Sequence, residues 1–374
     1  MTFPNTAFLL DSAPRTWSSQ EDRHLAICQS LIAAGSRPVL VFSGALPDEM
    51  HRRFADAGIA IETVNYETGT LSFYSGLKRI LRQHGIERVH IIFFDYFRAV
   101  AWITKLAGGK SIVYEMQNGG VFRARTWKRF LIQARNRIMT APFVRIIAIS
   151  EYIKGQLVEG GIPAGKIAVR HLGIDTKRFR PNSTQRDCLA KRFGIKPGEI
   201  ILSTVSYLRP IKNPQIIVQA CGELAKRGIA AHLFVAGDGE MLNELKELSN
   251  ELGIAERVHW LGLVPDPTAL LQASDVFLLA TVGEAFGLVL AESMACGVPV
   301  VGANAGAIPE VVKDAETGLL VEAWSAGALA DGIEKLAKNP SLQRRMSQQA
   351  IERVANNFTL PKAVDETLEI YRQL

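Results

Sequence analysis

The sequence predicts an α/β protein with two doubly wound parallel-sheet domains. Short apolar runs alternate with amphipathic stretches from one end of the chain to the other, as expected for parallel strands joined by helices. Residues 172–199 interrupt this alternation with a polar segment rich in turn-forming residues. We therefore place a domain boundary there, so that each half of the chain forms one sheet flanked by helices.

The first half of the chain alternates regularly. We expect strands at residues 7–10, 39–42, 59–64, 88–93, 111–113, 145–148 and 166–169. We expect helices at residues 20–33, 48–57, 71–84, 96–107, 126–137 and 151–159. Gly35, Gly58 and Gly85 stand where three of these helices should end, since a helix often closes on a glycine.

The second half repeats the pattern. We expect strands at residues 200–205, 231–236, 258–261, 276–279, 299–301 and 318–321, with helices at 326–338, 341–355 and 360–374. Open parallel sheets bind ligands beyond the carboxyl ends of their strands. The two halves would then face each other across a cleft that holds the chemistry.

Composition narrows the class of protein. The chain has 374 residues, 48% of them hydrophobic and 21% charged, which suits a globular protein with two cores. Its four cysteines show no paired spacing and its histidines no metal-ligand spacing. The N-terminal stretch lacks a basic leader, and no apolar run approaches a membrane span. We expect a cytoplasmic protein without metal or cofactor.

The positive charge is confined to the first half. Residues 1–172 carry 22 Lys and Arg against 13 Asp and Glu, and residues 173–374 carry 21 against 24, which together give the net charge of +6. An anionic partner or surface should therefore meet the first half. We expect no nucleic-acid partner.

The stretch 284–309 combines a loop, a helix and a glycine-rich turn just after the expected strand 276–279. Glu284 precedes the helix, which opens at Phe286-Gly287-Leu288. First-turn N–H groups have no partner within a helix, so they suit a phosphate. Glu292 lies among apolar residues, where ribose hydroxyls would satisfy its charge. The alternative is an ordinary helix with a surface Glu at each end.

The spacing of this stretch carries a family resemblance. Two Glu separated by seven residues, with Phe-Gly between them, resemble the signature of retaining glycosyltransferases of the GT-B fold, family 4, also called group 1 glycosyltransferases. The flanking segments 273–279 and 297–301 are similar as well. The resemblance implies that Glu284 faces the donor sugar, that the Phe286, Gly287 and Leu288 amides hold the diphosphate, and that Glu292 binds the ribose.

The turn 206–214 offers a cation for the same site. The family pattern there is Gly-Arg, four residues, Lys, then Gly or Asn; Lys212 and Asn213 match it, whereas Ser206 and Tyr207 do not. Lys212 would stabilise the charge that grows on a departing diphosphate. Arg209 either supplies the missing second cation or is a solvated surface residue.

Two further segments of the second half are similar to the family but less specific. Gly237 belongs to a Gly-Asp-Gly-Glu turn that resembles a nucleotide-binding motif, although simple turn chemistry also explains it. Val264 ends a segment whose backbone reads the base in relatives. We expect both to lie at the donor site.

The first half departs from the family at two places. The loop 12–20 lacks the Gly-Gly pair that relatives often carry, and Gln117 stands where many have a His near the donor sugar. Gln can hydrogen-bond a sugar hydroxyl but cannot shuttle a proton. Retaining transfer can instead use the departing phosphate as base, so we keep Gln117 as a catalytic candidate beside Glu284 and Lys212.

Two segments of the first half could meet the acceptor or a membrane. Asp95, Tyr96 and Arg98 follow the strand 88–93 and are candidates for acceptor binding, unless Asp95 merely caps a helix. Residues 121–138 form a basic amphipathic stretch, with Arg123 to Arg137 and no acidic residue. It either lies on an anionic bilayer or buries Trp127 and Leu131 on the sheet with its charges in water.

Together these features predict a retaining, metal-independent glycosyltransferase. It would move a sugar from a nucleotide-diphosphate donor, expected to be a UDP-sugar, to a glycan or lipid-linked acceptor in cell-surface polysaccharide biosynthesis. Residues 1–172 would bind acceptor, residues 173–358 the nucleotide sugar, and residues 359–374 would form a helix that packs back on the first domain. The alternatives are a non-catalytic nucleotide-sugar-binding homologue and a nucleotide-sugar epimerase of the same fold.

Overall fold

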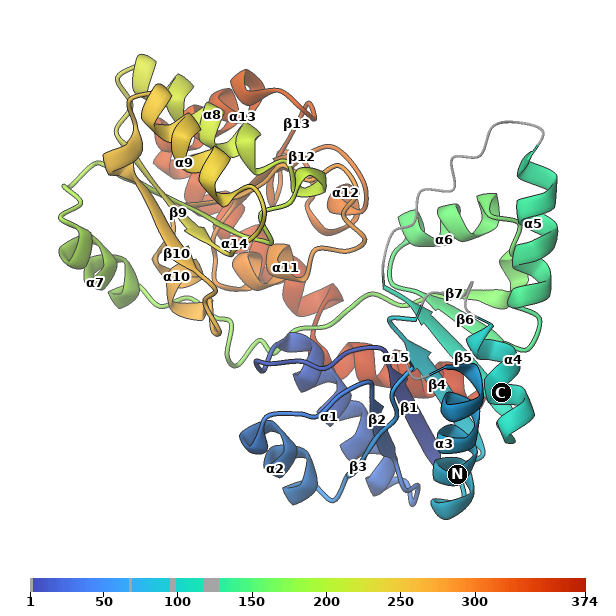
Figure 1. Cartoon of the computed structure of the whole chain (residues 1–374). Coiled ribbons are helices and arrows are strands. Elements are labelled where there is room, and N and C mark those ends of the chain that lie inside the picture. The colour runs from blue at the N-terminus through green and yellow to red at the C-terminus, as the bar shows by residue number, and fades with distance from the viewer. Residues whose placement is uncertain (1–2, 67–68, 95–98, 118–127) are drawn as a thin grey trace. The chain divides into compact units, whose positions relative to one another are not determined.

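The computed structural model describes residues 3–66, 69–94, 99–117 and 128–374. The chain divides into two compact units (Figure 1). One unit runs to Gly173 and adds Leu360–Leu374, and the other is Ile174–Thr359. Each unit is built around its own parallel sheet.

The sheet of the first unit has seven strands within the described residues, in the order β3-β2-β1-β4-β5-β6-β7, all paired in parallel. The strands are β1 (Thr6–Leu10), β2 (Val39–Phe42), β3 (Ala60–Thr63), β4 (Arg88–Ile92), β5 (Ser111–Met116), β6 (Arg145–Ala148) and β7 (Ile167–Val169). The order reverses between β1 and β4, so the connections that follow these two strands run in opposite directions and leave a crevice at the carboxyl edge.

Helices cover this sheet. They are α1 (Ser19–Ala33), α2 (Asp48–Asp56), α3 (Thr70–Gln83), α4 (Val100–Ala107), α5 (Lys128–Met139), α6 (Glu151–Glu159), η2 (Ala164–Lys166) and α15 (Leu360–Arg372). The C-terminal helix α15 packs against α1 (Figure 1), and its Tyr371 is buried in the same core as Phe8 and Leu31. The predicted return of the last helix to the first domain is thus confirmed.

The sheet of the second unit has six strands within the described residues, in the order β10-β9-β8-β11-β12-β13. They are β8 (Ile200–Val205), β9 (Ala231–Ala236), β10 (Val258–Gly262), β11 (Val276–Leu279), β12 (Val300–Ala303) and β13 (Gly318–Val321). Its helices are α7 (Thr184–Phe193), η3 (Pro210–Lys212), α8 (Pro214–Lys226), α9 (Leu242–Glu251), η4 (Ala255–Arg257), α10 (Thr268–Ala273), α11 (Leu288–Ala295), α12 (Ile308–Val311), α13 (Ala326–Ala337) and α14 (Pro340–Asn357). Here the order reverses between β8 and β11.

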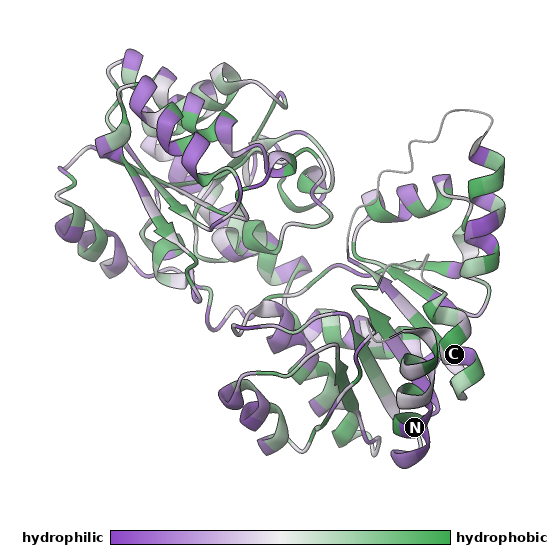
Figure 2. Ribbon diagram, viewed as in Figure 1, coloured by the Kyte–Doolittle hydropathy of each residue, from purple (hydrophilic) through white to green (hydrophobic). Residues whose placement is uncertain are grey.

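Local chemistry explains where several helices begin. Ser18 precedes α1 and forms a capping box with Glu21, in which each side chain satisfies a backbone N–H of the first turn. Ser150, Ser325 and Asn339 precede α6, α13 and α14. Each of these side chains accepts one hydrogen bond from a first-turn N–H, without a capping box. Between the caps, Figure 2 shows strands that are mainly hydrophobic and helices such as α2 and α7 that are mainly hydrophilic.

The predicted fold class is confirmed, with differences at a few boundaries. Strand β5 continues to Met116, three residues beyond the predicted end at 113, because the buried Glu115 belongs to the sheet. Helix α5 leaves Leu131 62% exposed, so the expectation that this residue is buried on the sheet is wrong. Trp127, from the same expectation, lies outside the described residues. Within the described residues, no helix has the length and apolar character needed to cross a membrane.

Candidate active site

Lys212 and Glu284 meet at the point where the strand order of the second sheet reverses. Lys212 ends η3, just after β8, and Glu284 lies in the loop after β11, the neighbouring strand. Lys212 Nζ donates to Glu284 Oε2 at 2.8 Å. The two side chains are 29% and 13% exposed, so the pair reaches solvent at the carboxyl edge of the sheet.

Two hydrogen bonds from side chains to backbone carbonyls hold the two loops together independently of this ion pair. Thr281 Oγ1 donates to the Ile211 carbonyl at 3.1 Å, and Asn213 Nδ2 donates to the Ala280 carbonyl at 3.4 Å. Asn213 is buried and adopts a left-handed backbone (φ +51°), which turns the chain from η3 into α8. The spacing between Lys212 and Glu284 is therefore fixed by the scaffold.

The loop that carries Glu284 is also fixed from its other side. The Ala307 amide donates to the Glu284 carbonyl at 2.9 Å, and a Cβ on Gly306 would lie 2.8 Å from the Glu284 backbone nitrogen and oxygen. Gly287 has φ +85°, and a Cβ there would lie 2.7 Å from Leu290 Cδ1. Both positions require glycine, because a side chain would displace the loop and a left-handed backbone disfavours one.

Helix α11 begins directly after this loop. It starts at Leu288, and the Leu290 amide of its first turn donates to the Gly287 carbonyl at 2.9 Å. The first N–H groups of a helix lack the intrahelical partners that later residues have. Phe286 is buried and packs edge-on against Phe358, with ring centroids 5.6 Å apart. Glu292 is buried on the helix. The predicted residues Glu284, Phe286, Gly287, Leu288 and Glu292 therefore lie on one loop and the helix that follows it, and Lys212 reaches Glu284 from the neighbouring loop after β8.

The other predicted donor residues lie on nearby strand ends but do not join the ion pair. Arg209 is exposed, and its guanidinium lies 5.4 Å from the centre of the Tyr207 ring. Gly237 lets two backbones approach closely, since a Cβ there would lie 1.9 Å from the Ser206 carbonyl oxygen. Val264 packs partly against a small cluster around Phe234. The structure thus gives Gly237 and Val264 evident roles in packing.

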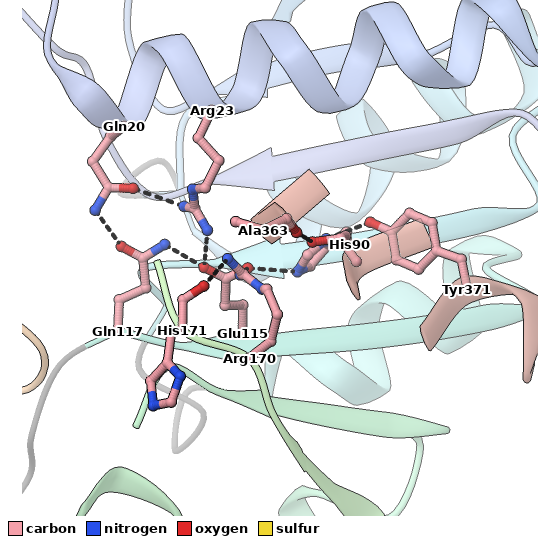
Figure 3. A network of polar contacts seen from close by, with 10 residues as sticks. Gln20, Arg23, His90, Glu115, Gln117, Arg170, His171, Ala363 and Tyr371 are labelled. Atoms are coloured by element: carbon pink, nitrogen blue, oxygen red, sulfur yellow. Dashed lines mark hydrogen bonds and ion pairs between the residues drawn. The ribbon is translucent and has the colours of Figure 1, made fainter. Parts of the chain in front are cut away.

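Gln117 lies in the first unit, directly after β5, and its side chain is tied into a polar network (Figure 3). Its Nε2 donates to Glu115 Oε1 at 2.5 Å, and its Oε1 accepts from Gln20 Nε2 at 2.8 Å. Only 7% of Gln117 is exposed. Asp95, Tyr96 and Arg98, the acceptor candidates, lie outside the described residues.

Glu115 is the centre of the network. Its Oε1 accepts from Arg23 at 2.6 Å as well as from Gln117, and its Oε2 accepts from Arg170 and lies 3.4 Å from His90 Nε2. Burial alone would raise the pKa of Glu115, but the two guanidinium groups and His90 outweigh it and hold the pKa well below its ordinary value. The carboxylate is therefore ionised at neutral pH.

Two buried histidines lie beside this centre. His90 Nδ1 lies 2.5 Å from the Tyr371 hydroxyl on α15. Because the Glu115 carboxylate only accepts, His90 carries its proton on Nε2 and accepts the Tyr371 hydroxyl proton at Nδ1. Burial lowers the pKa of His90 and, with the Arg23 charge, lowers that of His24 further, so both rings stay neutral.

Sequence reasoning found Gln117 through the family resemblance and missed its partners. Arg23, Glu115 and Arg170 come from α1, from β5 and from the residue after β7. One signal was available: a Glu that follows the apolar residues 112–114 inside a strand is costly to bury without a cation. Which cations would reach it could not be read from spacing, because they lie 92 and 55 residues away.

Comparison with known proteins identifies the family. Residues 24–178 match the sequence profile described as Glycosyltransferase Family 4, and residues 185–353 match the profile described as Glycosyl transferases group 1. The chain belongs to glycosyltransferase family 4. The resemblance drawn from the 284–292 spacing is therefore confirmed, and with it the GT-B fold.

Named family 4 relatives are similar over different lengths. N-acetyl-alpha-D-glucosaminyl L-malate synthase of Bacillus anthracis is 38% identical over 193 residues, which is 52% of this chain and 50% of that protein. D-inositol 3-phosphate glycosyltransferase of Rhodococcus opacus is 29% identical over 323 residues, covering 82% and 72% of the two chains. The match to the first relative therefore spans half its length.

Solved structures of other proteins share the fold. A glycosyltransferase from Rickettsia africae superposes with a TM-score of 0.82 at 21% identity, covering 99% of this chain and 98% of that one. HepE of Anabaena, crystallised with UDP-glucose, gives a TM-score of 0.82 at 19% identity, covering 99% and 100%. At these identities the likeness concerns the fold alone.

The close approach at Gly306 yields a first prediction. Gly306→Ala should destabilise the protein by about 1–3 kcal/mol and displace the Glu284 loop, because it adds a Cβ at a left-handed position against backbone. Urea unfolding measures the loss. Gly327→Ala is the matched control, since it lies in α13 with open space around it and should be neutral or slightly stabilising. Equal effects of the two substitutions would contradict the prediction.

The Glu115 network yields a second prediction. Glu115→Gln should lower the free energy of unfolding by about 3–5 kcal/mol, because it leaves Arg23 and Arg170 buried without their counter-ion. The control is Glu87→Gln, which breaks the surface pair with Lys110 and should cost under about 1 kcal/mol. Urea denaturation at pH 7 compares them. A Glu115→Gln protein as stable as the control would show that the carboxylate is not needed as a charge.

Proposed function

We propose that the protein is a retaining glycosyltransferase that moves a sugar from a UDP-sugar to a glycan or lipid-linked acceptor. The observation that carries the proposal is the Lys212–Glu284 pair, held at the strand-order reversal of the second sheet directly before the first turn of α11. In this proposal residues 173–358 bind the donor and residues 1–172 the acceptor, with residues 359–374 returning to the first domain.

The proposed roles follow from charge. As the glycosidic bond breaks, negative charge grows on the departing diphosphate, and the Lys212 ammonium with the amides of Phe286, Gly287 and Leu288 would stabilise it. Glu284 would accept hydrogen bonds from the donor sugar, and Glu292 from the ribose. Arg209 is a second cation and the backbones at Gly237 and Val264 are base contacts in the same proposal.

The chemistry does not require a protein base. Gln117 is an amide and cannot take a proton. A departing phosphate oxygen can accept the proton of the attacking acceptor hydroxyl, on the same face of the sugar, so that the new bond forms with retention. Gln117 would then contribute by hydrogen-bonding a substrate hydroxyl rather than by proton transfer.

The identity of the donor and acceptor is supported by relatives. HepE was crystallised with UDP and with UDP-glucose, which favours a UDP-sugar. WaaG, whose structure gives a TM-score of 0.72 at 16% identity, is described as a glycosyltransferase involved in lipopolysaccharide biosynthesis. Together with the basic first half, these names favour a cytoplasmic enzyme of cell-surface polysaccharide synthesis that works at the inner membrane face.

A donor-release assay tests the proposal. With UDP-, GDP- and ADP-sugars and no acceptor, the wild type should release nucleotide slowly from one donor, and Lys212→Ala and Glu284→Ala should each reduce that rate roughly 10²–10³-fold. Lys226→Ala removes an exposed lysine of α8 in the same unit and should leave the rate unchanged.

The outcomes separate the alternatives. Saturable binding without release, even when acceptor is present, would favour the non-catalytic homologue. Release of an epimerised nucleotide sugar would favour the epimerase. If no nucleotide sugar binds, the assignment of the donor site is wrong.

We further propose that α5 contacts an anionic bilayer. Phe130 is 75% exposed, and Leu131 and Ile138, seven residues apart on one face of α5, are both exposed. The indole of Trp102 on α4 donates to the Ile138 carbonyl at 2.9 Å, which extends this apolar face toward α4. Between residues 99 and 150 the sequence contains nine Lys or Arg and one acid, the buried Glu115. Arg123 and Arg125, part of the original expectation, lie outside the described residues.

Sedimentation with vesicles tests the membrane contact. The wild type should bind vesicles rich in phosphatidylglycerol and not neutral ones, and binding should weaken with salt. Leu131→Ser combined with Ile138→Ser should weaken binding at least about tenfold. Leu71→Ser is the control, since Leu71 is 83% exposed on α3 of the same unit. Equal weakening by the control, or binding of neutral vesicles, would overturn the assignment to α5.

A further inference from the structure

Four side chains of the first unit form a closed ring of hydrogen bonds (Figure 3). Arg23 donates from one nitrogen to Glu115 Oε1 at 2.6 Å and from the other to Gln20 Oε1 at 2.7 Å. Gln20 Nε2 donates to Gln117 Oε1 at 2.8 Å, and Gln117 Nε2 donates to Glu115 Oε1 at 2.5 Å. The ring joins the first turns of α1 to the end of β5.

The charged members of the ring fix the orientation of the two amides. A guanidinium can only donate and a carboxylate can only accept. Gln20 must therefore turn its oxygen toward Arg23 and its nitrogen toward Gln117, and Gln117 must turn its nitrogen toward Glu115. Reversing either amide would set donor against donor and acceptor against acceptor. Arg170, held on the second oxygen of Glu115, anchors the carboxylate in turn.

The ring lies where a parallel sheet binds ligands. Helix α1 follows β1, and the strand order of the first sheet reverses between β1 and β4. Gln117 leaves β5, the next strand beyond β4, at the same edge. Arg23 and Glu115 are buried, whereas Gln20 is half-buried. Gln117 is 7% exposed. A ligand at this edge would therefore meet Gln20 and the small exposed part of Gln117, and not the buried charges.

Each amide keeps capacity for a further partner. An amide group offers two N–H donors and two acceptor lone pairs, and the ring uses one of each on Gln20 and one of each on Gln117 within the part of the chain that the structure describes. A pair that offers both a donor and an acceptor complements a hydroxyl, which also both donates and accepts. It does not complement a phosphate, which only accepts.

We propose that Gln20 is a substrate-binding residue and that the oriented Gln20–Gln117 amide pair binds a hydroxyl group of a sugar or polyol. This inference rests on the proposed glycosyltransferase function and adds a residue to it. Arg23 and Glu115 act through the amides as positioning residues. The hydroxyl belongs either to the donor sugar or to the acceptor, and these two sources have separate readouts.

A double-mutant cycle on the full-length protein tests the pair. Dissociation constants for UDP-glucose and for UDP, used as probes, are measured for the wild type, Gln20→Ala, Gln117→Ala and the double variant, together with the KM for acceptor. We expect each single substitution to raise either the dissociation constant for UDP-glucose or the KM for acceptor, roughly five- to tenfold. This is the effect of losing one neutral hydrogen bond. The double variant should be no worse than the singles, because either substitution disrupts the pair.

The binding constants distinguish a hydroxyl of the donor sugar from a hydroxyl of the acceptor. Weaker UDP-glucose binding with unchanged UDP binding assigns the hydroxyl to the donor sugar, and a raised acceptor KM assigns it to the acceptor. Gln83→Ala is the matched control, since Gln83 is exposed on α3 of the same unit. If UDP does not bind to the wild type, the proposed function is wrong, whatever the Gln20 and Gln117 variants do. If UDP binds but both singles leave all constants within about twofold of the wild type, or their effects add, the inference is overturned.

Gln20→Glu separates recognition from stability. The new carboxylate keeps an acceptor for Arg23 but sets an oxygen against Gln117 Oε1, so the melting temperature should fall no more than in Gln20→Ala. It cannot donate to Gln117 Oε1, so substrate binding should weaken as in Gln20→Ala. A Gln20→Glu protein with full affinity would show that the Gln20 N–H groups do not bind substrate, and would overturn the inference.

Discussion

The polarity of a parallel sheet is the constraint on which the other features depend. All strands of such a sheet end on the same edge, and where the strand order reverses the following loops part and leave room for a ligand. In the second unit that point lies between β8 and β11, where Lys212 and Glu284 meet. In the first unit it lies between β1 and β4, beside Gln20 and Gln117. Residues distant in sequence are brought together because their strands are neighbours.

The charged side chains of the two sites differ in burial and in how easily they change partners. Lys212 and Glu284 form a partly exposed pair at the sheet edge, which contributes little to stability and can exchange partners at small cost. In the proposed function, Lys212 would turn to the arriving diphosphate and leave the Glu284 carboxylate for a sugar hydroxyl. Glu115 is instead surrounded by Arg23, Arg170, Gln117 and His90. If one of the arginines moved away, a buried charge would be left without its partner. The first arrangement suits binding and release, and the second suits rigid positioning.

Local signals in the sequence were enough for the fold and for the closeness of Glu284, Phe286 and Glu292 in the second unit. Apolar runs and glycine stops place the strands, and the spacing of Glu284, Phe286 and Glu292 lies within one loop and helix, where distance along the chain is distance in space. The Arg23–Glu115–Arg170 cluster could not be found in this way, because its members come from three separate elements. The predicted strand 111–113 also ended before Glu115, whereas β5 continues through this buried residue to Met116.

At the position that we propose for sugar binding, the first unit carries an amide in place of a titratable side chain. An imidazole at position 117 would change charge near neutral pH, and its protonation would depend on the charged groups around it. Gln117 has no such dependence, and its orientation is imposed by Arg23 through Gln20 on one side and by Glu115 on the other. Because Glu115 has a pKa held well below its ordinary value and both neighbouring histidines stay neutral, the ring keeps one polarity across the neutral range. The buried ions thus fix the orientation of the two amides. Under the proposed inference, the substrate would then be recognised without proton transfer.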